Sequence, residues 1–140
     1  MMSDILCSFD QIHDAVVWDY HVDFRANRLC MTVGWAKPEN SVTLCFDGLL
    51  AHHFENVIET NILFDIEEVT HSYFLQKREV FLKEKLRFGF PINKNDCRTI
   101  EQFAGYLEGY RIFQIDSSLG LIGFVIAKEI TIPHQVLLNG

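Results

Sequence analysis

The chain has 140 residues, a length typical of one domain with a single sizeable core. Hydrophobic residues make up 49% of it, which excludes a disordered chain, and 19 acidic against 12 basic residues give a net charge of −7. This charge makes nucleic acid a poor partner and a basic protein partner a better one. The apolar runs are far shorter than the roughly 20 residues that span a bilayer, so no membrane association is expected.

The N-terminus, MMSDILCSFD, lacks the basic and apolar regions of a signal peptide, so a cytoplasmic location is predicted. The four cysteines, Cys7, Cys30, Cys45 and Cys97, form no CxxC pair. We therefore expect all four to be reduced, structural thiols, in preference to disulfides or metal ligands.

Strand-like alternation runs through the first half of the chain. After a lead-in over residues 1–10, expected to hold one helical turn, residues 15–24 alternate, with Trp18, Tyr20, Val22 and Phe24 on one face. Residues 28–35 alternate in return, and a tight turn at 25–27 predicts an antiparallel hairpin. Further strands are predicted from Val42, over 49–57 (or an irregular crossing there) and over 61–70, where Ile62, Phe64 and Ile66 share a face.

The period changes in the second half. Residues 73–87 fit an amphipathic helix, the alternative being a strand pair that breaks near Glu79. Thr99 and Gln102 have capping-box spacing and predict a helix that ends near Gly109. Residues 111–132 are the strongest strand signal, two strands joined by a turn at 117–120. The second strand places Phe124, Ile126 and Ile130 on one face and the small Gly123 and Ala127 on the other, where the helix over 100–107 is expected to pack.

Consecutive strands without helical crossovers predict a single domain, 1–140, of the α+β class, mainly an antiparallel β-sheet with one or two helices. The chain has no nucleotide-binding glycine motif, and the serines at 117–118 lack the flanking glycines of a nucleophile elbow, so no cofactor is predicted.

Three polar groups are candidate sites. His13-Asp14 suits a general base, although a local turn with His13 packed at an edge is the favoured interpretation. His52-His53 would point to opposite faces of a strand and has no third ligand nearby, so no metal is predicted. Carboxylates on two predicted strands could share one acidic face, which would be simply solvated, act as the paired carboxylates of a hydrolase, or meet a basic partner; these are Asp19, Asp23, Asp65, Glu67 and Glu68.

Short segments along the chain resemble a known group of proteins. They are Ile12-His13-Asp14-Ala15, the FENVI stretch at 54–58, and the closing stretches at 116–120 and 123–127. Together they resemble small bacterial immunity proteins of polymorphic-toxin and contact-dependent inhibition systems. The resemblance implies a cytoplasmic, non-enzymatic domain that binds and blocks a cognate toxin, and it carries over no catalytic or binding residue.

Two functions from different classes follow. The first is a non-enzymatic binding protein, an immunity-type inhibitor that neutralises a bacterial toxin by occlusion and meets it through Asp19, Asp23, Asp65, Glu67 and Glu68. The second is a small hydrolase-like enzyme that uses His13 and Asp14 with nearby carboxylates. A self-associating structural domain is a third possibility that the aromatic content allows.

Overall fold

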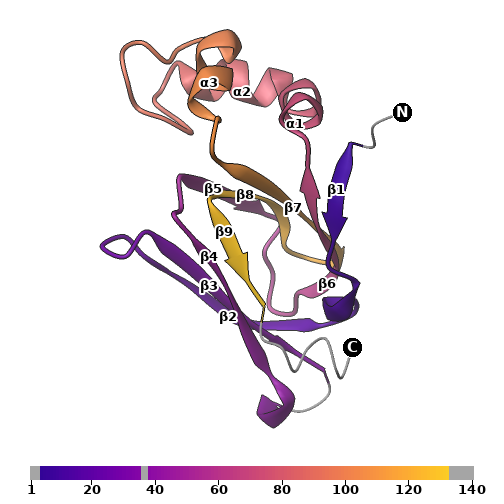
Figure 1. Cartoon of the computed structure of the whole chain (residues 1–140). Coiled ribbons are helices and arrows are strands. Elements are labelled where there is room, and N and C mark those ends of the chain that lie inside the picture. Colours follow the sequence, from indigo (N-terminus) through magenta and orange to yellow (C-terminus); the bar gives the residue numbers. More distant parts are fainter. Residues whose placement is uncertain (1–3, 36–37, 133–140) are drawn as a thin grey trace.

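The computed structural model describes residues 4–35 and 38–132 of the chain (Figure 1). Its strands are β1 (Ile5–Ser8), β2 (Val16–Asp23), β3 (Arg28–Gly34), β4 (Val42–Asp47), β5 (Ala51–Glu55), β6 (Ile62–Val69), β7 (Arg111–Leu119), β8 (Ile122–Ala127) and β9 (Glu129–Thr131). Its helices are α1 (His71–Lys77), α2 (Glu79–Leu86) and α3 (Ile100–Tyr106), with 3-10 turns η1 (Asp10–Ile12) and η2 (Pro38–Asn40). All pairings among these strands are antiparallel, which confirms the predicted α+β class.

The sheet closes on itself. Its order is β5-β8-β7-β6-β2-β3-β4-β9, with β1 added to β6. Only Gly48 to Leu50 separate β4 from β5, and only Lys128 separates β8 from β9. β4 continues into β5 across a bend, and β8 continues into β9 in the same way. These two long strands pair with each other, β4 with β9 and β5 with β8, and the hydrogen bond from Lys128 N to Asp47 O joins them at the bend. The result is a closed ring of strands, a small barrel, because β6 also pairs with β2 at Ile62 and Val16.

Two hydrophobic cores lie on the two sides of β7 and β8. The barrel interior holds one core, which includes Leu29, Met31, Leu44 and Phe113. The other lies between the sheet and the helices, which cover the outside of β7 and β8 (Figure 1). It includes Phe74, Leu82, Phe103, Phe124 and Ile126. Within the described ranges, no helix is long and apolar enough to cross a membrane.

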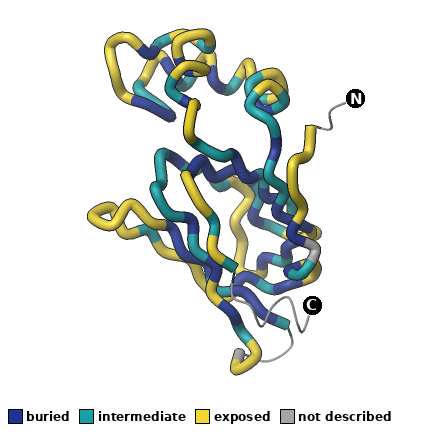
Figure 2. Tube along the Cα trace, in the orientation of Figure 1, coloured by how far each residue is buried: buried dark blue, intermediate teal, exposed yellow. Residues whose placement is uncertain are grey.

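The β2–β3 hairpin is confirmed, and its tip is exposed (Figure 2). Asn27 takes a φ of 53° in the predicted turn. Tyr20 and Val22 lie opposite Met31 and Leu29, on the barrel side. The prediction is wrong for Trp18, where a bulge breaks the register, and for Phe24, which lies in the turn with 80% of its surface exposed.

The face predicted for residues 61–70 is wrong, because β6 contains two register shifts between Ile62 and Asp65. The second shift leaves Phe64 as an extra residue in β6, with no partner in β7, and an extra residue moves the side chains that follow it to the opposite face. Leu63 and Ile66 are consequently both fully buried, whereas Phe64 is 53% exposed. The lead-in was expected to be helical, but Ile5–Ser8 forms β1 beside the end of β6.

The closing strand changes face at Lys128. Val125 and Ala127 point into the barrel, and after the extra residue Ile130 does so as well, opposite Phe46. Phe124 and Ile126 meet the helices, so the prediction that a helix packs on Gly123 and Ala127 is wrong. Gly123 instead accommodates β5, because a Cβ there would lie 1.8 Å from the His53 carbonyl oxygen.

The helix α3 begins and ends where its capping residues predict. Thr99 and Gln102 form the predicted capping box at the start of α3, and Gly109 follows the helix with a φ of 87°. The helix predicted over 73–87 is present but breaks at Arg78 into α1 and α2. The glycine, proline and asparagines of residues 88–95 predict a loop, and these residues form neither helix nor strand between α2 and α3. Pro133, which the sequence suggests as the end of the last strand, lies outside the described residues.

Candidate functional site

The outside of β2, β3, β4 and β9 is a four-stranded surface on which no described helix packs (Figure 1). Interior residues such as Leu29, Met31 and Phe46 occupy alternate positions of these strands, so the intervening side chains point outward. We call this surface the outer face. Its residues are Asp19, His21, Asp23, Arg28, Cys30, Thr32, Thr43, Cys45, Asp47, Glu129 and Thr131.

Strand register arranges the outer face in three rows. One row joins Asp19, Thr32 and Thr43, the next His21, Cys30, Cys45 and Thr131, and the third Asp23, Arg28, Asp47 and Glu129. Four carboxylates thus stand against one guanidinium, that of Arg28, whose Nε lies 2.6 Å from Asp47 Oδ1. Carboxylates on one uncovered sheet face create a negative potential that attracts cationic groups.

The tip of the β2–β3 hairpin extends this face. Asp23 Oδ1 accepts hydrogen bonds from the backbone N–H groups of Arg25 and Ala26, at 2.9 and 3.0 Å, which fixes the turn. Phe24, the residue between Asp23 and Arg25, has 80% of its surface exposed. An exposed aromatic ring on a rigid turn, beside carboxylates, is suited to insertion into a pocket of a partner.

The five carboxylates predicted to share one face are divided by the structure. Asp19 and Asp23 are exposed on the outer face, whereas β6 meets β2 only near Val16 and Ile62, so its carboxylates lie elsewhere. Asp65 is only 8% exposed and accepts hydrogen bonds from the Ser8 hydroxyl and the Ile66 N–H. Such a carboxylate satisfies groups within the protein and presents little charge to a partner.

The other two carboxylates of β6 lie towards β1 and β7. Glu68 receives two hydrogen bonds from the Arg111 guanidinium, at 2.8 and 3.1 Å, and these bonds are the main cause of the raised pKa of Arg111. Glu67 lies opposite Ser8 of β1 and Gln114 of β7. The outer face instead gains Asp47 and Glu129. Sequence reasoning missed Asp47 and Glu129 because their place on the outer face depends on strand register. The predicted hairpin of 16–23 with 28–34 was the one local signal from which part of this register could be derived.

The prediction of four reduced cysteines is wrong for two of them. Cys30 and Cys45 lie directly opposite each other on β3 and β4 and form a disulfide, whereas Cys7 and Cys97 are free thiols. Sequence spacing concealed this pair, because Cys30 and Cys45 meet only when the two strands take this register. Cys97 is fully buried, and this burial is the main cause of its raised pKa.

His13 and Asp14 occupy an exposed turn. His13 Nδ1 lies 2.8 Å from the Phe64 carbonyl oxygen, its Nε2 lies 3.4 Å from Asp14 Oδ2, and its ring packs edge-on against Phe64. Both ring nitrogens face groups of the protein, which leaves neither directed at a substrate. A general base needs one free nitrogen within reach of the proton it removes, so this geometry disfavours catalysis by His13.

His52 and His53 point to opposite faces of β5, as predicted for a strand. His52 lies against Phe54 on the barrel side, and burial, with a smaller contribution from His53, lowers its pKa. His53 lies 4.7 Å from the ring of Phe81 and 5.8 Å from that of Phe124, on the helical side. Across the described ranges, His, Cys, Asp and Glu side chains form no group of three or more that could hold a metal ion.

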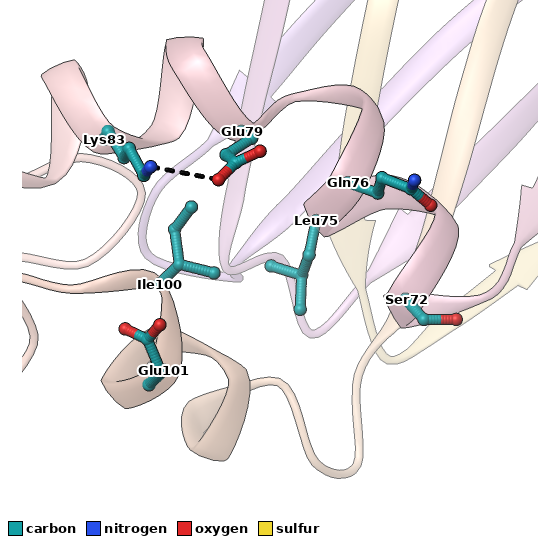
Figure 3. Close-up of a pocket in the computed structure, with 7 residues that line it drawn as sticks. All are labelled: Ser72, Leu75, Gln76, Glu79, Lys83, Ile100 and Glu101. Carbon is teal, nitrogen blue, oxygen red and sulfur yellow. Dashed lines mark ion pairs between the residues drawn. The ribbon is translucent and has the colours of Figure 1, made fainter.

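A pocket of about 420 Å³ lies among the three helices (Figure 3). Leu75 and Ile100 form its apolar centre, and Glu79 and Lys83, 3.0 Å apart, form an ion pair beside them. Ser72, Gln76 and Glu101 complete the lining. The lining holds no histidine that could activate the Ser72 hydroxyl, and its lysine is paired with Glu79.

No protein-family model, curated protein or solved structure matches the chain.

Proposed function

We propose that the protein is a non-enzymatic binding protein of the immunity type, which neutralises a basic toxin domain by occluding it with the outer face. The observation that carries this function is the sheet surface on which no described helix packs, where Asp19, Asp23, Asp47 and Glu129 share the strand rows with a single described cation, Arg28. A toxin that acts on nucleic acid carries lysines and arginines where it meets phosphate. An acidic surface competes for the same cations.

Several features favour binding over catalysis. Asp19 and Asp23 are exposed carboxylates, which attract a cationic partner through their charge alone. Phe24 adds an exposed aromatic side chain next to this surface, and aromatic residues are enriched at protein interfaces. The His13 geometry, by contrast, leaves no nitrogen for a substrate. The proposal also includes a cytoplasmic location, in which a toxin that reaches its target would be met.

Affinity capture from a native lysate tests this function. The tagged protein is compared with Asp19→Lys/Asp23→Lys on the outer face and with Glu84→Lys/Glu108→Lys, which makes the same charge change at exposed positions of the helical layer. One stoichiometric basic partner should bind the wild type and the helical variant but not the outer-face variant. Co-expression of that partner should be toxic alone and harmless with the wild-type protein.

Two results would contradict the function. Equal capture by all three proteins would remove the outer face from the interface. A captured partner whose toxicity is unaffected by the wild-type protein would exclude inhibition by occlusion.

A further inference from the structure

The Cys30–Cys45 disulfide lies in the middle row of the outer face, flanked across the strands by His21 and Thr131. Its two Cα atoms are 4.2 Å apart, a spacing close to that of a narrow antiparallel pair. Cys30 is only 6% exposed, whereas Cys45 is partly exposed. The bond lies on the outward side of β3 and β4, so a dissolved thiol approaches it from the outer face and not through the barrel core.

β3 and β4 do not depend on this bond for their pairing. Their ladder continues on both sides of it, from Arg28 opposite Asp47 to Val33 opposite Val42. On the interior side of the same strands, Leu29, Met31 and Leu44 are fully buried. Backbone hydrogen bonds and the barrel core thus hold the two strands together whether the sulfurs are joined or not.

We propose that the Cys30–Cys45 disulfide is a thiol–disulfide switch, which a dithiol opens and a disulfide closes while the barrel stays folded. This inference goes beyond the proposed function, and its readouts need no partner. In the oxidised state the centre of the outer face carries one apolar disulfide bridge, and in the reduced state it carries two thiols. The neighbouring rows, Thr32–Thr43 and Arg28–Asp47, lie directly beside the bond that breaks.

The opening reaction is an ordinary exchange. A thiolate of the dithiol attacks Cys45 Sγ, the protein S–S bond breaks, and Cys30 Sγ leaves as a thiolate that takes a proton from water. The second thiol of the reductant then displaces Cys45 Sγ, which is protonated in turn. The dithiol is oxidised to a cyclic disulfide, and the protein gains two electrons and two protons.

The test is reduction of the folded full chain with dithiothreitol, followed by N-ethylmaleimide labelling in denaturant and mass spectrometry of the peptides. Cys7 and Cys97 should be labelled before reduction, and Cys30 and Cys45 only after it. Circular dichroism should show the same fold in the reduced protein, with a lower but still cooperative melting transition. After removal of dithiothreitol, oxidised glutathione should restore the bond and be reduced to two molecules of glutathione.

An interior variant separates a native-state switch from a structural disulfide. Ile115→Val, in the barrel core on β7, should raise the unfolded population about fivefold. If the bond is reduced in the folded state, Ile115→Val should be reduced at a rate within about twofold of the wild-type rate, because exchange then depends on access to the bond and not on unfolding. A rate that rises about fivefold with the unfolded population, as expected if the bond opens only in the unfolded chain, would overturn the inference. Loss of the fold on reduction, or labelling of Cys30 and Cys45 before it, would overturn it as well.

Discussion

Arg111 and Glu68 join β7 to β6 through two hydrogen bonds, Nη2 to Oε1 at 2.8 Å and Nε to Oε2 at 3.1 Å. The Glu68 side chain is only 12% exposed, whereas that of Arg111 is 39% exposed. The carboxylate therefore depends on this one guanidinium to compensate for its lost contact with water.

Removing the cation alone should be costly. Arg111→Met leaves the largely buried Glu68 carboxylate without its partner, and we expect the free energy of unfolding to fall by about 1–2 kcal/mol. The double variant Glu68→Gln/Arg111→Met should recover part of this loss, since no charge then remains at the site. Urea unfolding measures both. Equal stability of Arg111→Met and the wild type would show that the pair contributes nothing.

Two glycines form a matched pair for a test of the barrel. Gly123 has a φ of 155°, and a Cβ there would lie 1.8 Å from the His53 carbonyl oxygen, whereas a Cβ at Gly105 in α3 would meet nothing within 4 Å. Gly123→Ala should push β5 away from β8 and cost more than about 2 kcal/mol. Gly105→Ala should stabilise the protein by about 0.5–1 kcal/mol, because alanine favours a helix.

Thermal unfolding of the two alanine variants measures the difference. A Gly123→Ala protein as stable as Gly105→Ala would contradict the close approach of β5 to β8.

Acid should destabilise the protein through His52. Burial lowers the folded-state pKa of His52 below its ordinary value of 6.5, so in the range below 6.5 the unfolded chain binds the proton more readily. The stability contributed by the neutral imidazole is complete above pH 6.5 and is lost as the pH falls through the folded-state pKa.

His52→Gln should reduce the loss of stability between pH 7.5 and pH 5.5. The measurement is urea unfolding at both pH values. An unchanged loss in His52→Gln would rule out His52 as its source.

Local signals predicted the parts of the fold that local chemistry determines. The turn at Asn27 gave the β2–β3 hairpin, and the Thr99–Gln102 capping box gave the start of α3. Both depend on residues a few positions apart. The strands 111–119 and 122–127 followed from period-2 alternation in the same way.

The errors arose where tertiary contacts changed the local pattern. The extra residues at Phe64 in β6 and at Lys128 after β8 move the side chains that follow to the other face, and neither leaves a distinct composition in the sequence. The same cause divided the predicted acidic face, because Asp65 and Glu68 are positioned by β1 and β7. Cys30 and Cys45 likewise became a pair only through the β3–β4 register.

Association kinetics test the central proposal, that the outer face docks a basic partner. The rate constant is measured by stopped flow with the captured partner at 0.05 and 0.5 M salt, for wild type, Asp19→Lys/Asp23→Lys and Glu84→Lys/Glu108→Lys. The outer-face variant should associate at least about tenfold more slowly at low salt and lose most of its salt dependence, while the helical variant stays much closer to wild type. Equal slowing in both variants would mean that only net charge matters, and unchanged kinetics in the outer-face variant would place the partner elsewhere on the protein.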